Sequence, residues 1–216
     1  MGLKPTYGLL PAEGIFPLAY TMDHVGPMAR TVEDVACLFK ALPDSRSRAL
    51  LEEKYRSRNE IAKGKIRRLE GVRAGILKDH VIKELCHEAI WKGYQEVLKA
   101  AEDEGAKIVE IAFPDFDAVY TTALILTLAQ ASQIHRTRMA DHPGGFGEDV
   151  RLLLEAGYLV SAVDYVQAQK VRAKLIETAL LLTEKTECWV MPTTPNPAIP
   201  VGGTDLTIAL NTAHSR

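Results

Sequence analysis

The sequence contains few cysteines, and none of them is arranged for a disulfide or a metal. Among its 216 residues are Cys37, Cys86 and Cys188, which lie far apart and form neither a CxxC pair nor a Cys/His cluster. We therefore expect no disulfide framework and no zinc site. Cys37 and Cys86 fall in helical patterns and Cys188 opens an apolar strand, so all three are expected to be inert thiols of the core.

The chain also has no long apolar run and no signal-peptide pattern. Its most apolar stretch, residues 118–131, is too short to span a bilayer and is interrupted by threonines and a glutamine. We interpret this stretch as a buried helix. The residues after Met1 do not combine a charged start with an apolar stretch, as signal peptides do. These features predict a cytoplasmic protein without a membrane partner.

Neither sign of charge dominates the composition. The chain has 26 basic and 28 acidic residues and a formal net charge of −2. Nucleic-acid binding usually requires a basic face, so no nucleic-acid partner is expected. The most highly charged region, residues 44–70, mixes both signs and is predicted to be a solvated linker or an insertion.

Familiar catalytic motifs are missing as well. A serine nucleophile needs a nearby base and backbone N–H groups for the oxyanion, which glycine-rich surroundings usually supply. None of the six serines lies in a GxSxG motif or next to a glycine. There is no HExxH motif, and the histidines are not spaced as ligand pairs on a helix, so no metal site is expected.

What the sequence does contain is an alternation of strand and helix patterns. Residues 72–77 and 108–113 alternate apolar with other side chains, as strands do, and residues 188–191 form a third short apolar strand. An apolar helical stripe over residues 90–101 joins the first two strands, and Gly105 is suited to end that helix. This strand–helix–strand unit predicts an α/β fold with a largely parallel sheet.

Further helices are predicted around this unit. Thr31 is a typical N-cap for a short helix. Residues 117–139 predict a long helix, and residues 148–185 predict one or two more, with Gly157 as a plausible break between them. Residues 1–30 are rich in glycine and proline and show neither the periodicity of a helix nor that of a strand. They are predicted to form loops.

The order of several motifs along the chain resembles a known enzyme family. They are GLKPTYG (2–8), DHVGPM (23–28), RTVED (30–34), GVR (71–73), Asp164-Tyr165 with Ala168 and Arg172, and MPTTP (191–195). The first block is specific, whereas the later ones are individually weak. Together they resemble the amidase-signature family, which includes amidases and glutamyl-tRNA amidotransferase subunits, just downstream of the family's serine loop.

The resemblance implies both a fold and a parent reaction. The implied fold is one partial amidase domain over residues 1–216, a layered α/β structure with a mixed sheet flanked by helices. The implied reaction is hydrolysis of the carboxamide C–N bond of a small amide through an acyl-enzyme, with two serines, a lysine base and no cofactor. In the family these residues precede the GLKPTYG block, and Lys4 within that block does not match the catalytic lysine. We therefore expect no catalytic residue in this chain.

A few polar residues are candidates for a site. Asp23 and His24 could form an acid–base pair, but an aspartate in such a loop more often bonds local backbone N–H groups. Asp23, Thr193 and Thr194 are kept as weak candidates for substrate binding. Gln130 stands where relatives often have an acidic residue in a similar Ala-x-Ala-Ser context.

Two functions remain open at this point. In the first, the chain is part of an amide hydrolase and supplies scaffold and one wall of a pocket. In the second, it is a binding or scaffold protein that kept part of the fold to dock a partner. In both cases, uncovered strand edges and apolar faces predict a homodimer or a partner that supplies the missing half.

Overall fold

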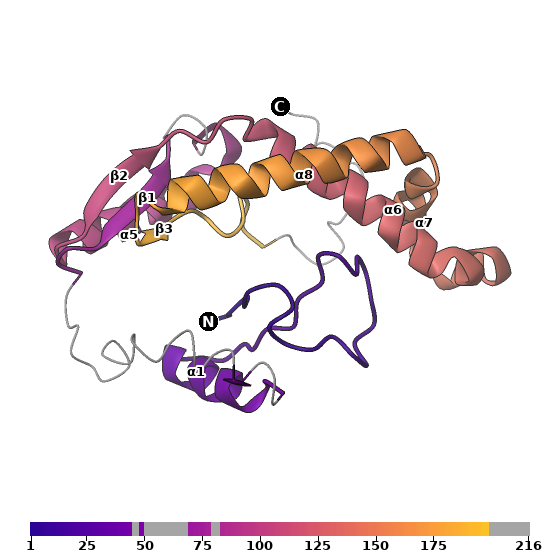
Figure 1. Ribbon diagram of the computed structural model, residues 1–216, viewed down its shortest axis with the longest axis horizontal. Helices are drawn as coiled ribbons and strands as arrows, with labels where there is room; N and C mark the ends of the chain where they lie inside the picture. Colours follow the sequence, from indigo (N-terminus) through magenta and orange to yellow (C-terminus); the bar gives the residue numbers. More distant parts are fainter. Residues whose placement is uncertain (45–47, 50–68, 79–82, 199–216) are drawn as a thin grey trace.

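The computed structural model describes residues 1–44, 48–49, 69–78 and 83–198 (Figure 1). Most of the predicted charged linker, residues 44–70, lies outside the described residues. The elements in chain order are α1 (Val32–Ala41), β1 (Arg73–Leu77), α5 (Glu88–Asp103), β2 (Lys107–Ile111), α6 (Asp117–Asp141), the 3₁₀ turn η1 (Pro143–Gly145), α7 (Glu148–Gly157), α8 (Ala162–Thr183) and β3 (Cys188–Trp189).

The three described strands form one sheet in the order β2-β1-β3. All of them run parallel: Arg73 to Leu77 of β1 pair with Lys107 to Ile111 of β2, and Ala74 and Gly75 pair with Cys188 and Trp189 of β3. A parallel neighbour requires a crossover connection, which α5 provides between β1 and β2. The predicted α/β class and the placement of all three segments in one sheet are confirmed.

One face of the sheet is covered by α5. Its apolar stripe packs on the strands, and the buried core there centres on Ile76, Leu77 and Tyr94. The Tyr94 hydroxyl donates to the Val190 carbonyl at 3.2 Å, which ties α5 to the end of β3. Gly105 follows the helix with φ of 97°, a conformation that favours glycine and directs the chain into β2.

Helices α6, α7 and α8 form a helical layer. Helices α6 and α8 pack side by side, and α7 packs against the far part of α6 (Figure 1). The middle of α6 is buried at Leu126, Gln130, Ala131 and Ser132, as the interpretation of its apolar stretch predicted. No helix in the described part of the chain is long and apolar enough to cross a lipid bilayer.

The break between α7 and α8 lies at the predicted glycine. Gly157 is the last residue of α7 and is buried against α6. A Cβ atom at this position would overlap the Ser132 hydroxyl and the Leu128 carbonyl, so only glycine allows the two helices to approach this closely. Ser161 then caps α8 by accepting a hydrogen bond from the Asp164 N–H at 3.1 Å.

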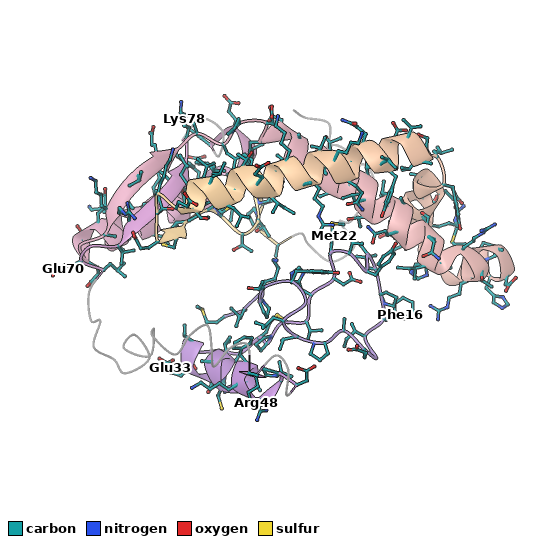
Figure 2. The ribbon with its side chains drawn as sticks, viewed as in Figure 1. Phe16, Met22, Glu33, Arg48, Glu70 and Lys78 are labelled. Carbon is teal, nitrogen blue, oxygen red and sulfur yellow. The ribbon has the colours of Figure 1, made fainter. Side chains whose placement is uncertain are left out.

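Residues 1–30, called the N-terminal segment below, contain turns and no helix, as predicted. An antiparallel bridge between Gly2 and Met28 brings the two ends of this segment together. Thr31 caps α1 as expected, with its hydroxyl accepting from the Asp34 N–H at 3.1 Å. The N-terminal segment and α1 lie on the lower side of the molecule in Figure 1, and Figure 2 shows the Met22 and Phe16 side chains on that segment.

The expected burial of the cysteines is wrong for two of the three. Cys37 and Cys188 are exposed, whereas Cys86 is partly buried. Val35 is the buried residue of α1, so Cys37, two positions further along, points away from the contact face. Cys188 lies in β3, which pairs with β1 on one side and forms an edge of the described sheet.

Candidate functional site

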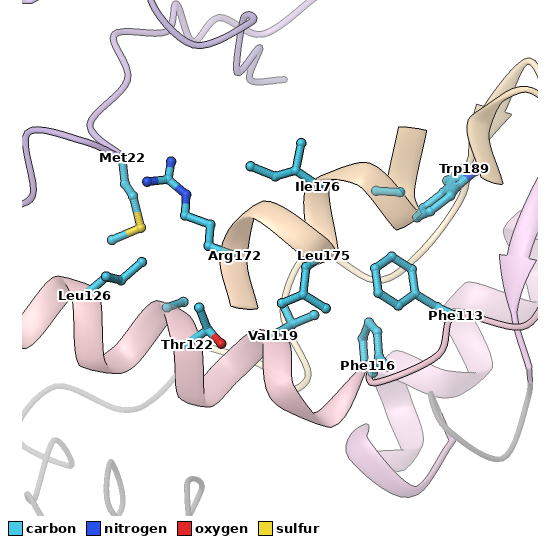
Figure 3. A pocket seen from close by; sticks show the side chains of 12 residues that line it. Met22, Phe113, Phe116, Val119, Thr122, Leu126, Arg172, Leu175, Ile176 and Trp189 are labelled. Carbon is cyan, nitrogen blue, oxygen red and sulfur yellow. The ribbon is translucent and has the colours of Figure 1, made fainter. Parts of the chain in front are cut away.

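A cavity of about 340 Å³ lies between α6 and α8, close to the sheet (Figure 3). This volume is within the range of small-molecule sites. Twelve residues line it: Met22 from the N-terminal segment; Phe113 and Phe116 from the chain between β2 and α6; Val119, Thr122, Ala123 and Leu126 from α6; Arg172, Leu175, Ile176 and Ala179 from α8; and Trp189 from β3. The walls are almost entirely apolar.

Helical spacing explains why these side chains share one cavity. Val119, Ala123 and Leu126 follow one another at intervals of four and three residues, so they lie on one face of α6. Leu175 and Ala179 are spaced in the same way on the facing surface of α8. The two alanines contribute little side-chain volume, which leaves space between helices that are otherwise in contact.

Aromatic rings form the wall of the cavity nearest the sheet. The Phe113 ring stands edge-on to both the Phe116 and Trp189 rings, with centroids 6.0 Å apart in each case. The Trp189 indole N–H donates to the Thr186 hydroxyl at 3.1 Å. Edge-to-face packing and this hydrogen bond orient the rings of this wall.

The charged residue among the twelve is Arg172. Its guanidinium donates to the Thr21 carbonyl at 2.8 Å, so the same side chain borders the cavity and holds the N-terminal segment. Thr122 adds a hydroxyl to the α6 wall. The cavity can thus accept an apolar group and offers a few polar contacts toward its Met22 side (Figure 3).

A second helix residue also binds Thr21. Gln130 of α6, which is only 2% exposed, accepts hydrogen bonds from the Thr21 N–H and hydroxyl, both at 3.1 Å. Its amide nitrogen lies 2.8 Å from the Thr21 hydroxyl oxygen. We call Thr21, Gln130 and Arg172 the Thr21 clamp.

The structure gives the adjacent pair Asp23 and His24 separate partners. The Asp23 carboxylate accepts from the Leu18 and Ala19 N–H groups at 3.0 to 3.1 Å, which is the local backbone bonding that the loop composition favours. The His24 Nδ1 lies 2.5 Å from the Met22 carbonyl and its Nε2 lies 3.3 Å from the Lys4 Nζ. Asp23 therefore shapes the loop next to Met22 and does not orient the imidazole.

The weak candidates Thr193 and Thr194 lie in the exposed loop after β3. The Thr194 hydroxyl donates to the Asn196 carbonyl at 3.1 Å. Neither threonine lines the cavity, nor does Asp23, so the structure does not bring the three predicted residues together there.

The serines that the structure describes in full have structural roles. Ser132 is 2% exposed, and its hydroxyl lies 2.8 Å from the Leu128 carbonyl and 2.6 Å from the Leu154 carbonyl. Ser161 is the N-cap of α8. Within the described ranges, no group of three or more His, Cys, Asp or Glu side chains could hold a metal ion.

The most perturbed titratable pair lies away from the cavity. Arg73 and Glu187 form a bidentate pair, with the closest N–O distance 2.7 Å. The Glu187 carboxylate also accepts from the Arg73 backbone N–H at 2.6 Å. Hydrogen bonds from the Arg73 side chain and backbone lower the pKa of Glu187 to about 2. This pair joins the start of β1 to the residue before β3 and is structural.

Sequence reasoning did not find the cavity itself. Val119, Leu126 and Leu175 have the spacing of ordinary core residues, and helical periodicity cannot distinguish a filled core from an open one. Ala123 and Ala179, two small residues on facing helices, were the available signal. Gln130 was noted only as a departure from its relatives, and its contact with Thr21 spans 109 residues of sequence.

The chain is similar to amidases and to glutamyl-tRNA(Gln) amidotransferase subunits. Residues 1–212 match the protein family described as Amidase. The amidase of Pseudomonas putida is 32% identical over 205 residues, which cover 92% of this chain and 42% of that protein. A glutamyl-tRNA(Gln) amidotransferase subunit from Synechococcus sp. (strain JA-3-3Ab) is 31% identical over 234 residues, which cover 94% of this chain and 44% of that protein.

The similarity extends to three-dimensional structure. A crystal structure of an amidase superimposes with a TM-score of 0.75 at 25% sequence identity, covering 93% of this chain and 42% of that chain. In each of these comparisons, this chain spans less than half the length of the relative that it matches.

Proposed function

The chain belongs to the amidase family of hydrolases, and on that premise we propose that it forms part of an enzyme that hydrolyses carboxamides. In the proposed reaction a serine hydroxyl adds to the amide carbonyl, the C–N bond breaks to release ammonia or an amine, and water then cleaves the acyl-enzyme to a carboxylic acid. The catalytic serines and lysine would come from outside this sequence. The observation that carries the proposal is the family match over residues 1–212.

We propose that the contribution of this chain to such an enzyme is the cavity between α6 and α8. Its apolar walls would take up the hydrocarbon part of a small amide, because removing apolar surface from water favours binding. Arg172 and Thr122 would face the more polar part of the substrate. Thr193 and Thr194, which do not line the cavity, remain weaker candidates for substrate contacts.

We also propose that residues 1–216 form one partial domain that requires further protein to complete it. Val163, Val166 and Leu180 of α8 are all more than half exposed, and they lie on one side of that helix. Such a stripe is typical of a helix that packs against another element. The occupant would be the remainder of an amidase fold or a second copy of this chain.

A hybrid protein tests the proposed function. In it, this chain replaces the matching 205-residue stretch of the Pseudomonas putida amidase, and ammonia release is measured with aliphatic and aromatic carboxamides. We expect hydrolysis by the hybrid. Leu126→Asp in the hybrid should suppress it, because a carboxylate would project into the apolar cavity.

A matched variant controls for a general effect of the added charge. Gln133 lies on the exposed side of the same helix. Gln133→Asp should therefore leave the rate of hydrolysis close to that of the parent hybrid. A hybrid that folds, as judged by circular dichroism, but releases no ammonia would contradict the proposal and favour a binding or scaffold protein.

A further inference from the structure

Thr21 is held by side chains from two helices that lie far from it in sequence. Gln130 of α6, 109 residues away, accepts from its N–H and hydroxyl. Arg172 of α8, 151 residues away, donates to its carbonyl. The backbone N–H, the carbonyl and the hydroxyl of Thr21 are thus all engaged by the helical layer.

Burial makes the Gln130 contact a constraint on the loop. Gln130 is 2% exposed, so water cannot readily replace a lost partner of its side chain. A buried amide that loses its hydrogen bonds is strongly disfavoured, so Gln130 keeps Thr21 in place while the helices are packed. The glutamine amide can both accept from the Thr21 N–H and donate to its hydroxyl oxygen.

The residue after Thr21 forms part of the cavity wall. Met22 lines the cavity, and its side chain extends toward Leu126 and Arg172 (Figure 3). Leu126 precedes Gln130 by four residues, one turn earlier on the same side of α6. The position of Met22 in the cavity wall therefore depends on where α6 and α8 hold Thr21.

We propose that Gln130 is a positioning residue that, through Thr21, holds Met22 against the cavity and so determines how tightly the cavity retains an apolar group. The proposal rests on the proposed function in that it takes this cavity as the binding site. Arg172 supports the same loop from α8, and Phe16 adds a separate contact in which its ring lies beneath the Arg138 guanidinium, 4.7 Å from the ring centroid.

Gln130→Met tests the proposal because methionine keeps the length of the side chain and removes both hydrogen-bonding functions. Hydrogen exchange is followed by mass spectrometry on the peptide that contains Thr21. We expect the Thr21 amide to exchange about tenfold faster, which corresponds to the loss of one net hydrogen bond. Peptides from β1 should be unchanged, whereas a general loss of structure would accelerate exchange there too.

A binding measurement links the clamp to the cavity. In a Trp91→Phe background, Trp189 in the cavity wall can transfer excitation energy to bound N-phenyl-1-naphthylamine, a neutral apolar probe. Gln130→Met should weaken this probe binding several-fold, on the order of the effect on exchange. Gln133→Met, on the exposed side of α6, should change neither exchange nor probe binding.

Unchanged Thr21 exchange or unchanged probe affinity in a folded Gln130→Met chain would overturn the proposal. If that variant does not fold, Thr21→Val takes its place, since it removes the hydroxyl and keeps the backbone contacts. In Thr21→Val, an increase in exchange of the residue 21 amide that is smaller than the one expected for Gln130→Met would support the proposal. No increase would overturn it. Neither hydrogen exchange nor probe binding requires hydrolysis. A negative result for the Thr21 clamp therefore does not affect the hybrid test, and an inactive hybrid does not affect the test of the Thr21 clamp.

Discussion

An exposed ion pair between Arg73 and Glu187 connects the start of β1 to the residue before β3. Side-chain and backbone groups of Arg73 both donate to the Glu187 carboxylate, while the Glu187 N–H donates to the Arg73 carbonyl at 2.9 Å. The contacts connect β1 to the short β3, which pairs with β1 through only two residues. Charge and backbone bonding therefore act together at this edge.

The lowered pKa of Glu187 predicts an acid-dependent loss of stability. Its pKa is about 2 in the folded chain, against an ordinary value of 4.5, so its contribution is fully present above pH 4.5. The contribution is lost as the pH falls from about 4.5 through 2, because the unfolded state takes up the proton first. Glu187→Gln should be less stable than the parent at pH 7, and the difference should shrink over that window.

Urea unfolding measured at several pH values between about 2 and 7 checks this expectation. Glu96→Gln, an exposed substitution on α5, is the control and should not reproduce the pH-dependent difference. A constant difference between Glu187→Gln and the parent across the whole range would contradict the role assigned to the pair.

Sequence alone anticipated some residue roles and missed others for physical reasons. The Thr31 cap and the local bonding of Asp23 depend on neighbours within five residues, so composition was sufficient. The exposure of Cys37 and the contact between Gln130 and Thr21 depend on which surfaces meet in three dimensions. Local pattern carries no information about those surfaces.

At the scale of elements, Gly157 fixes how closely α7 approaches α6. A Cβ atom there would overlap both a side-chain oxygen and the Leu128 carbonyl, and a backbone group cannot move aside as a flexible side chain can. Gly157→Ala is therefore expected to destabilise the chain by roughly 1–3 kcal/mol. Thermal and chemical unfolding would measure the change.

Gly93 provides the matched control within α5. An added Cβ atom there would meet nothing within 4 Å. Because alanine is the better helix former, Gly93→Ala should stabilise by up to about 1 kcal/mol. Equal effects of the two substitutions would mean that the α6–α7 contact is less tight than the structure indicates.

The order of the elements could be predicted because each has a clear local period. Residues 117–139 and 148–185 were expected to be helical and correspond to α6, α7 and α8, with the break at Gly157. The strand order β2-β1-β3 and the cavity could not be derived in this way. The sheet pairs Arg73 with Lys107 and Ala74 with Cys188, and the cavity is lined by both Met22 and Trp189. Periodicity does not encode contacts between segments so far apart in sequence.

At the scale of the whole molecule, the described chain leaves apolar surface uncovered. Leu180 is 63% exposed on α8, and Met28 is 81% exposed on the N-terminal segment. At roughly 25 cal/mol per Å², several hundred Å² of uncovered apolar area forfeits on the order of 10 kcal/mol, comparable to the stability of a typical domain. The isolated chain is therefore expected to be marginally stable or to associate.

Sedimentation velocity and thermal melting of the purified chain test this expectation. We expect a concentration-dependent increase in sedimentation coefficient, and Leu180→Lys should reduce it by placing a charge on the exposed stripe. Lys170→Ala, at an exposed position of the same helix, serves as a control for general surface change. A monodisperse monomer with a sharp transition at high temperature would show that the chain completes its own core.

We propose that this chain supplies fold and cavity to an amide hydrolase, whose serine nucleophile comes from elsewhere. Intact-mass analysis after treatment with a fluorophosphonate probe tests it most directly, because the probe labels an activated serine covalently. We predict no labelling of the isolated chain and one label per molecule in the hybrid with the Pseudomonas putida amidase. Stoichiometric labelling of one serine in the isolated chain would contradict the claim.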